Sequence, residues 1–156
     1  MKDYKPTWQV HGIFPEPIYL SHLNRPFTKK ELKSVESHKK GLIQNAGNKT
    51  SKDKYVLNKP EMSKLKKDLL KHINLYLEKV IATEHKVTLN ITQSWLNYTN
   101  ENQYHHEHSH SNSFLSGVLY MKANSETDRI FFHKDMSKGT LRLKPKTFNL
   151  YNSPEW

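Results

Sequence analysis

Apolar residues recur with a helical period in the middle of the chain. Five of them are spaced four residues apart and would form one stripe along a helix: Leu65, Leu69, Ile73, Leu77 and Ile81. Lysines such as Lys64, Lys67 and Lys71 fall on the opposite face. Pro60 suits the first position of a helix, where its missing N–H has no partner to lose. The pattern therefore predicts an amphipathic helix that begins at Pro60 and packs against a sheet.

An earlier helix is predicted by its N-terminal signal. Thr28 and Glu31 have the spacing of a capping box, in which each side chain bonds the backbone N–H of the other. The helix should run to about Lys40 and end at Gly41. Residues 44–53 are polar and are predicted to form a loop. Residues 13–20 contain two prolines and suit a short edge strand.

The period changes to two after Glu84, where apolar and polar residues alternate over 87–95. Four further segments are strand candidates: 114–121, 129–133, 140–143 and 147–151. No internal repeat or linker interrupts this order. The pattern predicts an α+β fold in a single domain, 1–156, with two helices first and then a run of antiparallel strands.

Charge and composition narrow the function classes. The net charge is +10, but the excess is nearly all lysine, and arginine, which dominates base and bidentate phosphate recognition, occurs only at Arg25, Arg129 and Arg142. A solvated lysine surface is therefore favoured, and nucleic-acid binding is the weaker alternative. The chain has no cysteine, no apolar run long enough to span a membrane and no secretory signal, so a cytoplasmic protein is expected.

The most concentrated chemistry is a run of four histidines within six residues. In an extended chain, His106, His108 and His110 would share one face, and His105 and Glu107 the other. Three imidazoles on one face are a plausible start of a metal site, although imidazole alone does not select among zinc, copper, iron and nickel. A surface histidine patch without metal is the alternative interpretation.

The segments around this run resemble a known family. They are Ser94–Tyr98 (Ser-Trp-Leu-Asn-Tyr), His108-Ser-His110, Asn112-Ser113 and Leu115–Tyr120 (Leu-Ser-Gly-Val-Leu-Tyr). Together they resemble the small 2-oxoglutarate/Fe(II) oxygenases of bacteria and their phages, with Ser111 where that family usually has proline. Phe14–Ile18 and Tyr55–Leu57 also fit, so the resemblance extends over nearly the whole chain.

The resemblance implies a double-stranded β-helix, which is a jelly-roll or cupin-like barrel, with helices packed on one side. It implies Fe(II), 2-oxoglutarate and O2 as reactants, and a second substrate that the sequence does not identify. His108 would be the first iron ligand, and His110 would stand where the family usually has a carboxylate. His106 is a further metal candidate. Two other pairs fit the strand geometry, His106 with His108 and His105 with Glu107.

Three more residues are candidates for binding 2-oxoglutarate. Tyr98 and Tyr120 could each present a hydroxyl to its far carboxylate, as a tyrosine often does in iron oxygenases, and Asn97 lies beside the first of them. Each tyrosine could instead be an ordinary half-buried strand residue, and Asn97 could instead cap a turn. In addition, Trp95 is expected in the core.

The chain departs from the family pattern after residue 150. The usual distal histidine and Arg-x-Ser motif are not found, so the chain is expected to be C-terminally incomplete. His133 and Arg142 are possible substitutes for the third ligand and the carboxylate-binding arginine. A barrel that lacks its last strands would expose an edge that a homodimer could cover. The alternative to an oxygenase is therefore a non-catalytic cupin-like module that binds a metal ion or another protein. Either protein would act in the cytoplasm, which would be that of the bacterial host if a phage encodes the chain.

Overall fold

A computed structural model of the protein describes residues 17–110 and 112–133. The chain divides into two compact units, Met1–His105 and His106–Trp156, and each is described by itself. The strands predicted at 140–143 and 147–151 lie outside the described residues, as does the first half of the strand predicted at 13–20. The second half, 17–20, forms no strand.

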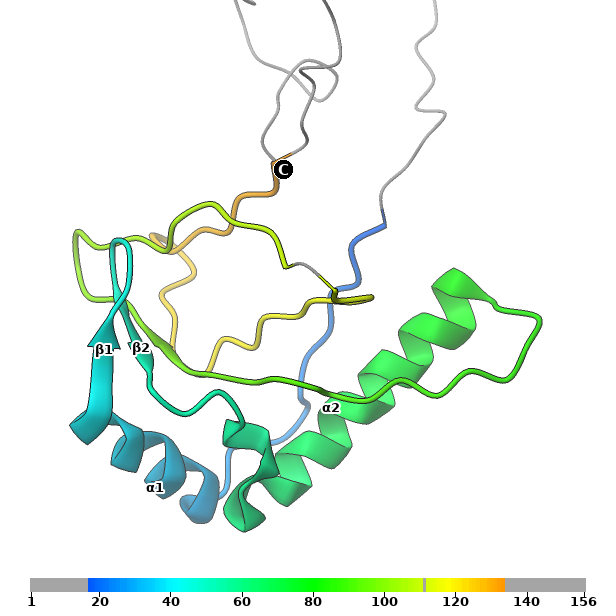
Figure 1. Cartoon of the computed structure of the whole chain (residues 1–156), viewed down its shortest axis with the longest axis horizontal. Coiled ribbons are helices and arrows are strands. Elements are labelled where there is room, and N and C mark those ends of the chain that lie inside the picture. The colour runs from blue at the N-terminus through cyan, green and yellow to red at the C-terminus, as the bar shows by residue number, and fades with distance from the viewer. Residues whose placement is uncertain (1–16, 111, 134–156) are drawn as a thin grey trace, which may run out of the picture. The chain divides into compact units, whose positions relative to one another are not determined.

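Helix α1, Lys29–His38, begins at the predicted capping box. The Glu31 backbone N–H donates to Thr28 Oγ1 at 3.2 Å, and the Thr28 N–H donates to the Glu31 carboxylate at 2.7 Å. A 3₁₀ turn, Lys39–Gly41, then ends the helix and leads into the first strand (Figure 1). The helix and both of its predicted ends are confirmed.

Helix α2, Ser63–Tyr76, follows a 3₁₀ turn over Pro60–Met62 and continues as a π-helical segment, Leu77–Ile81. The predicted apolar stripe is buried at Leu65 and Leu77, whereas Ile81 is exposed. A small core forms around Val56, Met62 and Leu65. Six partly buried side chains surround it: Leu23, Phe27, Val35, Leu57, Leu69 and Leu96.

A buried ion network joins the two helices. Glu31 is fully buried, and both of its carboxylate oxygens accept from Arg25, at 2.8 and 2.9 Å. The Arg25 Nε also donates to Asp68 of α2 at 2.7 Å. These hydrogen bonds hold the pKa of Glu31 below its usual value and lower that of Asp68 to about 2. The guanidinium therefore fixes α1 against α2 by satisfying two carboxylates at once.

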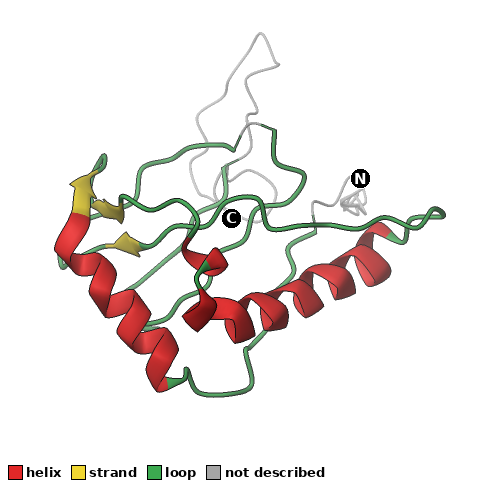
Figure 2. Cartoon of the chain, turned by 60° about the horizontal axis from the view of Figure 1, so that its bottom comes forward, coloured by secondary structure: helices red, strands yellow, loops and turns green. Residues whose placement is uncertain are grey.

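The sheet has three short antiparallel strands in the order β1–β2–β3, which are Leu42–Gln44, Lys49–Ser51 and Asn97–Tyr98 (Figure 2). The prediction of a loop over 44–53 is thus wrong in part, because β1 and β2 form a hairpin there. The segment was predicted to be a loop because its residues are polar. Thr50 and Ser51 are buried, and their hydroxyls bond the backbone carbonyl of Leu96 and that of Asp53 respectively.

Three other predicted strands are wrong for the described residues. Segment 87–95 contributes only a parallel bridge between Ser94 and Tyr55, and 114–121 and 129–133 form no strand beyond a bridge at His133. Most apolar side chains of 114–121 are also exposed, for example Phe114 at 66% and Val118 at 67%. An apolar sequence makes a strand only where a neighbouring backbone supplies the hydrogen bonds.

The described residues confirm the α+β class, with helices and a small antiparallel sheet. The double-stranded β-helix stays a prediction. Among these residues, no helix combines the length and apolar character that crossing a membrane would require.

Candidate metal centre

Three histidine rings are neighbours at the start of the second unit. The ring centroids of His106 and His108 are 4.9 Å apart, and those of His108 and His110 are 4.8 Å apart. Residues two apart in an extended chain point to the same side, which explains this series of rings. The three histidines predicted to bind metal therefore lie side by side.

A local hydrogen bond indicates which ring nitrogen of His108 carries the proton. Its Nδ1 lies 2.8 Å from the backbone carbonyl oxygen of His106. A carbonyl oxygen can only accept, so Nδ1 must be the protonated nitrogen. In neutral imidazole the lone pair is then on Nε2, which is the arrangement in which metal-binding histidines usually occur. His108 therefore has the proton placement of a ligand.

A wider group also includes His105. One ring nitrogen from each of His105, His106 and His108 lies within 4.8 Å of the others. Ligands bound to one ion at about 2.1 Å lie about 3–4 Å from one another, so small side-chain rotations would close such a group. These histidines lie within four consecutive residues, so their proximity is a property of the local chain.

The ring of His105 contacts a buried amide side chain of the first unit, that of Asn48. The Asn48 Nδ2 lies 3.0 Å from the His105 Nδ1 and donates to Thr99 Oγ1 at 3.2 Å. The Asn48 Oδ1 accepts from Asn45 Nδ2 at 3.1 Å. Asn48 has no exposed surface. This buried carboxamide therefore bonds three side chains, one of them at the start of the histidine run.

The hairpin turn also holds the residue before His105. The Tyr104 backbone N–H donates to the Gly47 carbonyl at 3.2 Å. Gly47 has a φ of 80°, and a Cβ there would clash with the Tyr104 carbonyl oxygen. Sequence reasoning missed the roles of Gly47 and Asn48. The available signal was Asn45-Ala-Gly-Asn48, a turn composition between two short segments.

Two other candidates near the run face each other. The His133 Nδ1 lies 3.8 Å from a Glu107 carboxylate oxygen, and both side chains are partly exposed. Glu107, proposed in one alternative as a ligand beside His105, thus has His133 as an ion-pair partner when that histidine is protonated. His133 as a third ligand stays a prediction.

The candidate 2-oxoglutarate residues have different surroundings. The Tyr98 hydroxyl donates to the Val35 carbonyl of α1 at 2.7 Å, and burial raises its pKa. Asn97 is exposed and pairs with Thr50 in the sheet. In the second unit, Tyr120 is half exposed, and partial burial and the charge of Asp128 raise its pKa. The role of each in binding 2-oxoglutarate stays a prediction.

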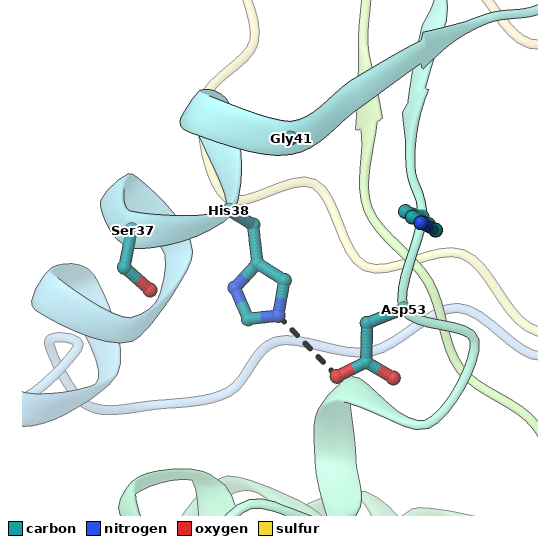
Figure 3. Close-up of a pocket in the computed structure, with 5 residues that line it drawn as sticks. Ser37, His38, Gly41 and Asp53 are labelled. Atoms are coloured by element: carbon teal, nitrogen blue, oxygen red, sulfur yellow. Dashed lines mark ion pairs between the residues drawn. The ribbon is translucent and has the colours of Figure 1, made fainter.

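A separate cavity of about 380 Å³ lies at the C-terminal end of α1 (Figure 3). His38 and Asp53 face each other beside it, with Nε2 and Oδ2 3.6 Å apart, and form an ion pair when His38 is protonated. The His38 Nδ1 lies 2.7 Å from the Ser34 carbonyl oxygen. The Tyr55 N–H and Lys59 lower the pKa of Asp53, so its carboxylate is charged. Neither residue carried a motif in the sequence.

The family comparison covers the segment that holds the run. Residues 93–152 match the model of a family described as "Putative 2OG-Fe(II) oxygenase". This match confirms the resemblance over that segment, and the cofactors that the family implies are Fe(II) and 2-oxoglutarate. The donor set fits such a metal, because iron accepts imidazole ligands. No curated protein and no solved structure matches the chain.

Proposed function

We propose that the protein is an Fe(II)- and 2-oxoglutarate-dependent oxygenase that hydroxylates a second substrate. The proposal rests on the position and the hydrogen bond of His108. It lies within the segment that matches the family, and its Nδ1–H donates to a backbone carbonyl, which leaves the lone pair on Nε2. We expect the protein to adopt the double-stranded β-helix of the family.

The iron would be held by His108 and His110, with His106 as a further ligand. Ring contacts of 4.8 and 4.9 Å between successive histidines support this choice. All three are neutral ligands, so the site would offset less of the metal's charge than the usual pair of histidines and a carboxylate. An anionic cosubstrate would supply the missing negative charge.

Tyr98, Tyr120 and Asn97 are the residues proposed to bind 2-oxoglutarate. Bound iron supplies the oxidation chemistry, in which 2-oxoglutarate and O2 become succinate and CO2 while the substrate gains one oxygen atom. The chain's own groups would orient the cosubstrate and limit access of water. Homodimerisation and a cytoplasmic location also stay predictions.

A second candidate is a non-catalytic cupin-like metal-binding or interaction module. One observation favours it. The Tyr98 hydroxyl already donates to the Val35 carbonyl, so binding a carboxylate with that proton would require this hydrogen bond to break. Such a module would bind a metal ion through the histidine run without consuming 2-oxoglutarate.

Succinate formation separates the two candidates. The full chain, supplied with Fe(II), ascorbate, O2 and 2-oxoglutarate, should form succinate even without its substrate, because these enzymes turn over slowly in an uncoupled reaction. His108→Ala should abolish this activity. His85→Ala, which changes an exposed histidine outside the run, should retain it. Metal binding without succinate formation would favour the module.

A further inference from the structure

We propose that helix α1 and the β1–β2 hairpin form a basic surface that binds the phosphate backbone of a nucleic acid without sequence preference. This basic surface consists of six lysines: Lys29, Lys30, Lys33, Lys40, Lys49 and Lys52. All six belong to the first unit and lie outside the histidine run. The inference therefore goes beyond the proposed oxygenase function and does not depend on it.

The lysines of the basic surface differ from other lysines of the first unit in their contacts. Lys59 pairs with Asp53, and Lys71 pairs with Asp68, each at 3.1 Å. The six lysines of the basic surface are exposed, and none forms an ion pair or a side-chain hydrogen bond with a residue that the structure describes. Their charges are therefore available to an external anion.

Acidic side chains offset little of this charge. Within residues 29–52 there are two acidic residues, and both have cationic partners. Glu31 is fully buried against Arg25, and Glu36 pairs with Lys39 at 2.9 Å. Because clustered charges of one sign raise the local concentration of an oppositely charged ligand, the basic surface should attract a polyanion.

Three of the lysines form a row along the outward face of α1 and the 3₁₀ turn that follows it. Lys29, Lys33 and Lys40 are four and seven residues apart, which places them on one side of a helix. The opposite side carries the buried Glu31 and Ser34. At about 1.5 Å per residue, the row is about 16 Å long. Phosphates recur about every 3.4 Å along one strand of B-DNA, so the row can contact several of them.

The hairpin adds Lys49 and Lys52 beside the end of this row. Helix α1 leads directly into the hairpin (Figure 1). Lys49 of β2 is opposite Tyr98 in the sheet, and the Tyr98 hydroxyl donates to the Val35 carbonyl of α1 at 2.7 Å. Lys52 lines the cavity at the C-terminal end of α1 together with Ser37. The fold therefore gathers around α1 lysines that are spread along the sequence.

The composition of the basic surface favours a nucleic acid over a lipid surface. Helices that bind an anionic membrane combine basic residues with large apolar side chains that enter the bilayer. Helix α1 has no aromatic residue, and its one leucine is Leu32. Lysine ammonium groups contact phosphates as point charges and do not read base edges through paired hydrogen bonds, as arginine does. Binding should therefore depend strongly on salt and show little sequence preference.

Fluorescence anisotropy of the full chain with labelled oligonucleotides tests the inference. The probes are a single strand of thymidines and two duplexes of different sequence, each about 20 nucleotides long, at about 50 to 200 mM salt. We expect binding at low salt, similar affinities for the two duplexes, and a loss of about tenfold or more across this range of salt. The measurement needs no metal ion, so its outcome is independent of the iron site. Absence of binding at low salt would overturn the inference.

A triple variant locates the contact on α1. Lys29→Gln, Lys33→Gln and Lys40→Gln, combined in one chain, should weaken binding about tenfold or more and flatten its salt dependence, because phosphate contacts are lost. The three side chains are exposed, so the variant should fold, and circular dichroism checks this. Unchanged affinity in the folded variant would contradict the assignment.

A matched control has the same net charge. Lys66→Gln, Lys67→Gln and Lys86→Gln together remove three positive charges from α2 and the loop after it, and should weaken binding less than about threefold, because distant charges are screened. Equal losses in the two triple variants would show that only net charge matters and would overturn the inference. Tighter binding to phosphatidylserine-containing vesicles than to any of the oligonucleotides would also overturn it, in favour of a lipid surface.

Discussion

At the residue scale, buried polar groups carry much of the specificity of the first unit. Glu31 and Asn48 are both fully buried, and each has several hydrogen-bond partners. A buried polar group without such partners would cost free energy, so these contacts are needed for folding. The capping role of Glu31 could be predicted from sequence, because its partner Thr28 is three residues away. The partners Arg25–Asp68 and Asn48–His105 could not, because they are 43 and 57 residues apart.

Replacing Arg25 by Met should strongly destabilise the protein. The substitution leaves the buried Glu31 carboxylate without its main partner, and breaking such a pair costs about 3–5 kcal/mol. Chemical denaturation should measure this loss. Arg25→Lys keeps the charge but cannot form the two-pronged bond, so its loss should be smaller. A loss below about 1 kcal/mol for Arg25→Met would show that the network does not join the helices.

Asp53→Asn should lower the stability in a pH-dependent way. The folded state holds the pKa of Asp53 below its ordinary value of 3.8, so the charged carboxylate stabilises the fold above that pH. This contribution disappears as the pH falls through the lower folded pKa. We therefore expect a loss of about 1 kcal/mol at neutral pH that shrinks below about pH 4. Denaturation curves across this range should measure it, and a difference that does not change with pH would contradict the assignment.

At the element scale, the helices follow from the sequence and the strands do not. Both helices carry local signals, the capping box of α1 and Pro60 before α2, that act within one turn. Strands need a partner that is distant in sequence, so alternation over 87–95 and the apolar run 114–121 predicted strands that do not form among the described residues. The β1–β2 hairpin was missed for the converse reason. Its strands are polar, and the hydroxyl groups of Thr50 and Ser51 donate hydrogen bonds to nearby backbone carbonyls.

The hairpin turn gives a matched pair of glycine substitutions. Gly47→Ala should destabilise the protein by about 1–3 kcal/mol, because φ is positive there and the new Cβ would meet the Tyr104 carbonyl. Gly41→Ala meets no atom within 4 Å and should change stability little. Thermal denaturation of both variants should measure the difference. Equal effects would mean that the turn does not pack against Tyr104.

The helix core makes a further prediction. Leu65 is 1% exposed and packs with Val56 and Met62. Leu65→Ala should therefore cost about 2–5 kcal/mol, through lost burial and a residual cavity. Leu75→Ala changes an exposed leucine of the same helix and is the matched control. Urea denaturation should give a lower midpoint concentration for Leu65→Ala than for Leu75→Ala. Similar midpoints would show that Leu65 is not part of the core.

At the scale of the whole molecule, the chemistry was easier to predict than the architecture. The four histidines and the surrounding motifs identified the family that residues 93–152 match. The second unit gives little support for the barrel, because most of its apolar side chains are exposed and the backbone of 106–110 and 112–133 forms no strand. The hydrogen bonds of the His105 and His108 rings required coordinates, because each involves an atom outside the imidazole ring.

The most direct test is calorimetric titration of the full chain with Mn(II), an inert substitute for Fe(II), with and without 2-oxoglutarate. We predict that the wild-type chain binds Mn(II), that 2-oxoglutarate tightens this binding, and that His108→Ala loses it while His85→Ala does not. The same Mn(II) affinity in the wild type and in His108→Ala, or no binding in either, would contradict an iron centre at the histidine run.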